Sequence, residues 1–205
     1  MNYRSNFFPR WAALGLLILA TAAAPQANAQ GAREDAREQA VSTQHHGGNS
    51  SRKNELVKIV RTATAKYYNA PVAFAEADGF QLLFGCVSDD DKGAMGLHYV
   101  QLSRYMPAPG VFDAEIKADE PEILLYEPTP NGPRLTGADY LVDAATWDAA
   151  NPAPPELNGQ IFHYFGAPNR FRLPPFYTLH VWAWKESPSG TFVNWHDNVS
   201  CDAHN

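Results

Sequence analysis

Three histidines and one glutamate lie inside short apolar stretches, where side chains that can bind a metal or move a proton are uncommon. They are His98, Glu127, His163 and His180. In an extended strand alternate side chains point to the same face, so each of the four shares a face with large apolar neighbours. A polar group buried without a partner costs about 1 to 3 kcal/mol. These four side chains are therefore expected to find partners inside the fold.

A metal site would provide such partners. Two imidazoles and one carboxylate form a ligand set that zinc and iron(II) accept, and imidazole also suits copper. We predict that His98, Glu127 and His180 bind a divalent ion (Zn, Fe or Cu), with His163 or His196 as a further ligand. Because these residues lie far apart in the sequence, the fold must bring them together.

Two other arrangements stay open. In the first, each imidazole bonds a backbone carbonyl or a tyrosine hydroxyl, and Glu127 pairs with an arginine: Arg134, Arg170 or Arg172. In the second, a histidine and a carboxylate form an acid/base pair without a metal. Neither arrangement requires a bound ion.

Aromatic residues make up 12% of the chain and concentrate in its second half. Most are expected in the core, since aromatic side chains bury large areas. A curved sheet lined with them can also hold a small-molecule ligand, with histidines as orienting polar groups. The predicted pocket residues are Tyr99, Tyr126, Trp182 and Trp184.

Hydrophobic periodicity indicates the elements that position these side chains. Apolar residues recur at helical spacing from about residue 51 to Pro71, and an alanine-rich second helix is expected over residues 72–78. After Gly79 short apolar or alternating runs separated by turn residues predict strands. The predicted strands cover residues 80–86, 96–102, 122–127, 134–142, 160–165 and 177–185, and residues 144–150 are expected to be helical. The predicted fold is α+β, with two N-terminal helices packed on a curved, mainly antiparallel sheet or partial barrel of about six strands.

The N-terminal segment has the pattern of a signal peptide over residues 1–29. Arg4 and Arg10 precede an apolar stretch, and Ala27-Asn28-Ala29 matches a small-x-small cleavage site. The apolar stretch is shorter than the roughly 20 residues that span a bilayer, which disfavours an uncleaved anchor. We predict a flexible polar leader over 30–51, a single domain over 52–205, no membrane span after signal removal, and a periplasmic or extracellular location.

Cys86 and Cys201 are the two cysteines of the chain. An oxidising compartment favours a disulfide between them. The alternative is a pair of buried thiols or metal ligands.

Charge and missing motifs exclude several classes of protein. The formal net charge is −6, which argues against a nucleic-acid partner, because phosphate contacts need clustered lysine and arginine. The sequence contains no GxGxxG, P-loop, HExxH or GxSxG pattern. No reaction type can be assigned from a short motif.

Five segments together form a recognisable pattern. They are GCVS at 85–88, GAMGLHYV at 93–100, PEILLYEP at 121–128, LHVWAWK at 179–185 and NVSC at 198–201. The chain thereby resembles a family of small exported bacterial proteins of uncharacterised function, which implies export but no chemistry. The predicted function is binding of a divalent metal or small ligand through the His/Glu cluster. The alternative is a structural or interaction protein of the cell envelope with no catalytic site.

Overall fold

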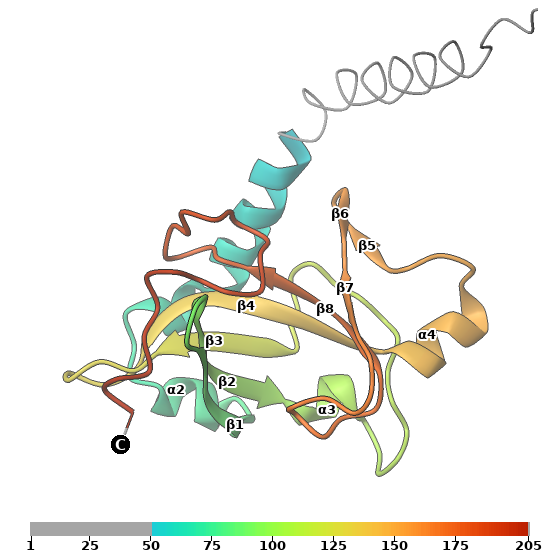
Figure 1. The fold of residues 1–205 in the computed structure, drawn as a ribbon, viewed down its shortest axis with the longest axis horizontal. Coiled ribbons are helices and arrows are strands. Elements are labelled where there is room, and N and C mark those ends of the chain that lie inside the picture. Colours follow the sequence, from blue (N-terminus) through green and yellow to red (C-terminus); the bar gives the residue numbers. More distant parts are fainter. Residues whose placement is uncertain (1–50, 205) are drawn as a thin grey trace, which may run out of the picture. The chain divides into compact units, whose positions relative to one another are not determined.

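A computed structural model describes residues 51–204 of the chain. The predicted signal peptide and almost all of the predicted leader lie outside the described residues. The described part is a mixture of helices and strands built around one curled sheet (Figure 1).

Both early helices lie after residue 50 rather than at the start of the chain. One helix covers residues 51–68 and α2 spans Ala73–Ala77. The side chains of Leu56 and Val60 on the first helix are fully buried against the sheet. Two further helices are α3 (Leu102–Tyr105) and α4 (Ala144–Ala150). The predicted helical segment 144–150 is thus confirmed.

The main sheet has six strands in the order β1-β2-β3-β4-β8-β7, and every neighbouring pair is antiparallel. It curls into a half-barrel, as the sequence predicted (Figure 1). Its strands are β1 (Phe80–Asp89), β2 (Gly93–Gln101), β3 (Ile123–Glu127), β4 (Arg134–Asp143), β7 (His163–Phe165) and β8 (Phe176–Val181).

The predicted strand over 160–165 is extended as expected, but it is divided between two sheets. β5 (Glu156–Leu157) and β6 (Gln160–Ile161) form a separate hairpin, and β7 follows after Phe162. The break changes which residues face inward. Phe162 is 4% exposed, whereas Ile161 is 65% exposed.

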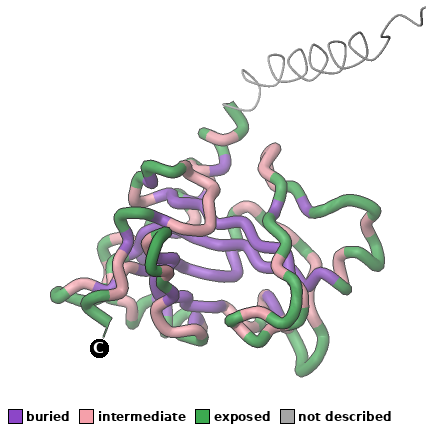
Figure 2. The backbone as a smooth tube through the Cα atoms, in the orientation of Figure 1, coloured by how far each residue is buried: buried purple, intermediate pink, exposed green. Residues whose placement is uncertain are grey.

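The two faces of the main sheet pack against different parts of the chain. Residues such as Tyr140 and Leu179 face the helix over residues 51–68. Alternate residues on the opposite face, among them Val100, Leu141 and Trp182, pack under loops and the C-terminal segment. Both faces are therefore buried along the central strands (Figure 2). Polar side chains that point to the loop-covered face lie in an apolar environment.

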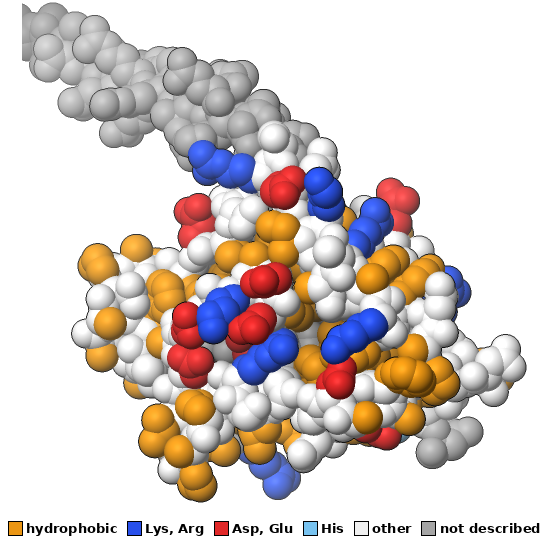
Figure 3. Space-filling model, turned by 180° about the vertical axis from the view of Figure 1, so that it is seen from behind, with side chains coloured by type: hydrophobic (Ala, Val, Ile, Leu, Met, Phe, Trp, Pro, Cys, Tyr) orange, Lys and Arg blue, Asp and Glu red, His pale blue; other side chains and the backbone are white. Residues whose placement is uncertain are grey.

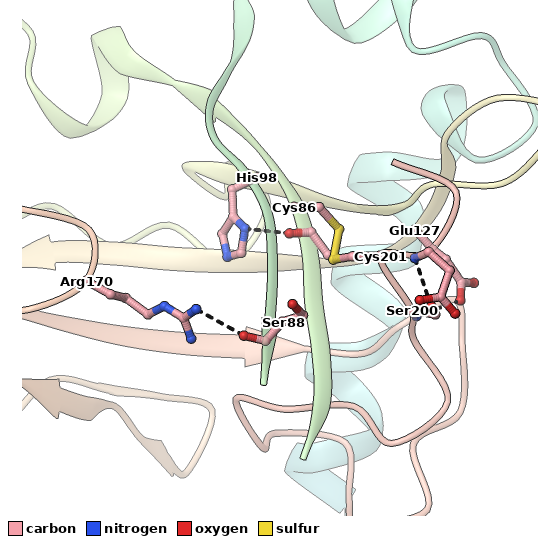
Figure 4. Close-up of a disulfide and its surroundings, with 9 residues drawn as sticks. Cys86, Ser88, His98, Glu127, Arg170, Ser200 and Cys201 are labelled. Carbon is pink, nitrogen blue, oxygen red and sulfur yellow. Dashed lines mark hydrogen bonds between the residues drawn. A yellow bond between two sulfur atoms is a disulfide. The ribbon is translucent and has the colours of Figure 1, made fainter. Parts of the chain in front are cut away.

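The predicted disulfide between Cys86 and Cys201 is confirmed, with the two Cα atoms 5.8 Å apart (Figure 4). It joins the C-terminal segment to the edge strand β1. A second attachment lies nearby, where Lys185 Nζ contacts the Glu127 carboxylate at 2.7 Å. The C-terminal segment is thus fixed over the loop-covered face.

The surface seen from behind in Figure 3 carries acidic and basic side chains next to one another, so neither sign forms a continuous patch in that view. Within residues 51–204 no helix has the length and apolar character needed to cross a membrane.

Candidate functional site

Three buried side chains meet on the loop-covered face of the sheet: His98 on β2, Asp139 on β4 and His180 on β8. Their exposed fractions are 3%, 2% and 2%. One potential ligand atom from each lies within 4.8 Å of the other two. Asp139 and His180 are register partners on neighbouring strands, and the ring centroids of His98 and His180 are 6.0 Å apart. We call these three residues the His/Asp cluster.

Backbone geometry fixes the protonation of His98. Its Nδ1 lies 3.1 Å from the Gly96 carbonyl oxygen, which can only accept a hydrogen bond, so Nδ1 carries the proton. Burial lowers the pKa of His98 to about 4, and the ring is neutral at pH 7. Nε2 therefore keeps its lone pair. A histidine that binds a metal through one nitrogen commonly donates the other N–H to a backbone carbonyl in this way.

Gly96, which provides that carbonyl, has a φ of +86°, in the region that favours glycine. A Cβ at this position would lie 2.4 Å from the Tyr126 carbonyl oxygen on β3. Gly96→Ala is therefore expected to lower the free energy of unfolding by about 2 to 4 kcal/mol, measured by chemical denaturation. Gly110→Ala is the matched control, because Gly110 has a φ of +74° with open space around it. Equal losses in the two variants would contradict the steric argument.

The Asp139 carboxyl is buried among apolar side chains and has one side-chain partner. Its Oδ1 accepts a hydrogen bond of 2.5 Å from the Thr178 hydroxyl. Burial raises the pKa of Asp139 to about 7, although the bonds from Thr178 and from backbone N–H groups act in the opposite direction. At neutral pH this carboxyl is close to the point at which it loses its proton.

His180 is the least satisfied member of the cluster. Both of its ring nitrogens are buried without a hydrogen bond of good geometry, although the Asn194 side chain lies close enough to act on its pKa in the upward direction. Asp139 Oδ1 lies 3.5 Å from Nδ1, which is too long for a good hydrogen bond. Burial, and to a lesser degree the neighbouring His98, lowers the pKa of His180 well below 6.5. The ring is neutral and its lone pair is unused.

The cluster opens into a small cavity. Counted as the space available to the centre of a water molecule, its volume is about 20 Å³, which is room for one water or one ion. The polar part of its wall is formed by the His/Asp cluster and Thr178, and the remainder is apolar, with phenylalanines making up half of its residues. An ion in this cavity would be surrounded by two neutral imidazoles and one carboxyl group.

Glu127, the carboxylate predicted to join the histidines, has other partners. It accepts hydrogen bonds from Lys185 Nζ at 2.8 and 2.7 Å and from the Ser200 backbone N–H at 3.2 Å. A register shift between Leu125 and Tyr126 precedes it, and Glu127 ends its strand. The carboxylate therefore lies against the C-terminal segment, and Asp139 takes its expected place beside the histidines. The cationic partner of Glu127 is Lys185 rather than one of the three arginines considered.

Neither of the two additional histidines belongs to the His/Asp cluster. His163 is exposed, and its Nε2 lies 3.2 Å from the Phe192 carbonyl oxygen. Its predicted inward orientation is wrong, because the chain breaks between β6 and β7. His196 is fully buried, but its Nδ1 accepts a hydrogen bond from the Asn198 backbone N–H and its ring packs on Trp182.

The four predicted pocket aromatics do not line the cavity. Tyr99 and Tyr126 point to the opposite face of the sheet, where they belong to the helix-side core. Trp182 shares the face of His180 but donates its indole N–H to the Val193 carbonyl. Trp184 follows the end of β8, stacks on Tyr68 and thus lies against the helix over residues 51–68. Phenylalanines line the cavity instead: Phe84, Phe165, Phe171 and Phe176.

Sequence reasoning missed Asp139, although a signal for it was present. The predicted strand over residues 134–142 is apolar around Asp139, and an acidic residue in the middle of a buried strand needs a partner. Alternation also places Asp139 on one face with Leu141, as the structure shows.

Comparison of the chain with protein-family models, with curated proteins and with solved structures gives no match.

Proposed function

We propose that this chain is an exported protein that binds one divalent transition-metal ion through His98, Asp139 and His180. The observation that carries the proposal is His180, whose two buried ring nitrogens make no hydrogen bond of good geometry and lie next to a buried carboxyl. A metal ion would use the free lone pair of His180 and take the place of the proton that Asp139 holds at low pH. The ion thereby offsets the cost of burying these groups.

The geometry requires only a small adjustment around the ion. Ligands about 2.1 Å from a zinc ion in a tetrahedral site lie about 3.4 Å from one another. The ligand atoms of the cluster lie within 4.8 Å of one another, so side-chain rotations that move these atoms by about 1 Å would complete the site. Two histidines and one carboxylate leave further coordination positions open for water or substrate, as in catalytic zinc and non-haem iron sites.

The disulfide supports the proposed export, since such bonds persist in oxidising compartments. The proposed site differs from the one predicted from the sequence in its carboxylate, which is Asp139 instead of Glu127.

Metal content tests the proposal. Untagged protein is dialysed against zinc, iron(II) or copper(II) and analysed for bound metal, and cobalt(II) is titrated in to give a spectroscopic signal. We expect about one ion per chain. His98→Ala, His180→Ala and Asp139→Asn are each expected to weaken binding by about 100-fold or more, which exceeds the effect of removing an outer-sphere partner.

Matched controls separate loss of a ligand from loss of the fold. Glu127→Gln removes a carboxylate and His163→Ala removes an imidazole outside the cluster, and both should retain the ion. His45→Ala/His46→Ala excludes binding by the N-terminal histidines. Asp139→Asn resembles the protonated carboxyl, so the metal-free variant should unfold at the same or a higher denaturant concentration at pH 8. No bound ion in the unmodified protein, or equal binding by cluster and control variants, would overturn the proposal.

A further inference from the structure

A second, larger pocket adjoins the cavity of the His/Asp cluster. Its volume is about 390 Å³, within the range of small-molecule sites. Phe84 and Phe171 line both spaces, and Leu83, Val87, Arg170 and Arg172 form other parts of its wall. We call it the seam pocket. The two shared phenylalanines form the boundary between this pocket and the buried cluster.

The seam pocket lies where the half-barrel closes. β1 and β7 are the two edges of the curled sheet, and the loop over residues 166–175, which follows β7, reaches back to β1. The ring centroids of Phe84 and Phe171 are 5.3 Å apart, and Arg170 Nη2 donates a hydrogen bond of 3.0 Å to the Ser88 carbonyl oxygen (Figure 4). Side chains close this seam, without a continuous backbone ladder.

An irregularity in β1 opens space at the seam. The register between β1 and β2 is interrupted between Leu82 and Cys86, so the intervening residues leave the regular ladder. Phe84 lies in this interruption and contacts His98 at a ring separation of 6.2 Å, while Leu83 remains 42% exposed. The Phe84 ring therefore lies between the seam pocket and the cluster.

The wall of the seam pocket combines apolar side chains with two arginines. Arg170 and Arg172 are its charged lining residues, and no acidic side chain lines it. This contrasts with a chain whose net charge is −6. Arg172 has a φ of +57°, a left-handed conformation that costs a residue with a side chain about 1 to 2 kcal/mol. The Asn169 side chain holds the loop in this shape by accepting hydrogen bonds from the backbone N–H groups of Phe171 and Leu173.

We propose that the seam pocket binds a small amphipathic anion, a ring or alkyl body carrying one carboxylate. The carboxylate pairs with Arg170 and Arg172, and the apolar body lies on Phe84 and Phe171, next to the His/Asp cluster. This inference rests on the proposed function, because it names the class of ligand that would lie beside the metal site, across Phe84 and Phe171. Guanidinium groups bind carboxylates by paired, charge-assisted hydrogen bonds, which gives selectivity for the anion over a neutral molecule of the same shape.

Binding of 2-naphthoate and of 2-naphthamide tests the proposal, because the two probes share one ring system and differ in charge. Binding is measured by titration calorimetry on the full chain, and the site is located from NMR shifts of backbone amides. We expect 2-naphthoate to bind at least ten-fold more tightly, with shifts concentrated at residues 83–88 and 169–172. Arg172→Gly removes one guanidinium at a φ that suits glycine, so it should weaken 2-naphthoate binding by about ten-fold without lowering the melting temperature.

Further variants make the result specific. Arg170→Gln should also weaken binding, whereas Arg134→Gln, at an exposed position on β4, should leave it unchanged. Equal affinity for the two probes, or equal binding by Arg172→Gly and Arg134→Gln, would overturn the proposal. Cobalt titration of Arg172→Gly reports separately on the cluster. If 2-naphthoate binds selectively and no metal binds, the seam-pocket proposal stands and the metal proposal fails. If metal binds and 2-naphthoate does not bind selectively, the metal proposal stands and the seam-pocket proposal fails.

Discussion

Replacing both Cys86 and Cys201 by serine is expected to lower the free energy of unfolding by about 4 to 5 kcal/mol. The two residues are 115 positions apart, so the bond restricts most of the described chain in the unfolded state. The loss of restriction dominates because loop-closure entropy grows with the length of the closed loop. The folded state also loses the covalent attachment of its C-terminal segment to β1.

Urea denaturation of the double variant and of the unmodified protein, each with and without a reducing agent, measures this contribution. Reduction should destabilise the unmodified protein to the level of the variant and leave the variant unchanged. Cys86→Ala/Cys201→Ala serves as the control for the added hydroxyl groups. A difference below about 1 kcal/mol between the unfolding free energies of the unmodified protein and the double variant would contradict the prediction. It would mean that residual contacts already restrict the unfolded chain without the disulfide.

Replacing Glu122 by glutamine changes the free energy of unfolding by an amount that depends on pH. We expect this change to be more favourable at pH 9 than at pH 4 by about 3 to 5 kcal/mol. Glu122 is 4% exposed, and its Oε2 accepts a hydrogen bond of 3.1 Å from the Leu141 backbone N–H. Burial raises the pKa of this carboxyl to about 8, and the nearby Asp139 acts in the same direction. Glutamine keeps an oxygen for the Leu141 N–H and removes the ionisation.

The sign follows from proton binding in the two states. Below pH 4.5 both states hold the Glu122 proton, and its ionisation has no effect on stability. Between pH 4.5 and about 8 the unfolded state releases the proton while the folded state keeps it, so the free energy of unfolding falls as the pH rises. Above about pH 8 both states are ionised and the loss is complete.

Other buried groups titrate in the same range. Asp139 acts in the same direction as Glu122, because its pKa is raised to about 7. His98 and His180 have lowered pKa values, so their contribution is lost as the pH falls below 6.5. The difference between the unmodified protein and Glu122→Gln isolates the carboxyl of interest. Glu55→Gln, at an exposed position on the first helix, controls for the loss of one negative charge. Parallel stability curves from pH 4 to pH 9 for the unmodified protein and Glu122→Gln would contradict the prediction.

Local patterns in the sequence predicted much of the fold. Residues 144–150 form the expected helix, with Asp143 Oδ1 accepting a hydrogen bond from the Thr146 N–H at its start. The runs of apolar residues at 122–127 and 134–142 lie within one residue of β3 and β4. These elements could be predicted because their apolar and polar residues alternate with the period of a helix or a strand, which is visible within a few neighbouring residues. The segment at 160–165 could not, since its break depends on the separate hairpin of β5 and β6, which is extended by a hydrogen bond from the Phe162 N–H to the Pro155 carbonyl.

The sequence predicted the two histidines of the candidate site but not its carboxylate. Alternation correctly placed His98 and His180 on one face, because each lies inside a regular strand. The pairing of β4 with β8 then selected the carboxylate, by placing Asp139 directly across from His180. Glu127 satisfied the same local pattern, but Lys185 and the C-terminal segment occupy its position in space.

The amino-acid sequence by itself determined the mixed helix and strand composition and the pairing of the two cysteines. The first depends on short-range periodicity, and the second depends on there being two cysteines in the chain. The tertiary structure decided which acidic side chain joins the two imidazoles, and where the edges of the half-barrel meet. Those outcomes depend on strand order and register, which are set by the packing of segments that lie far apart along the chain.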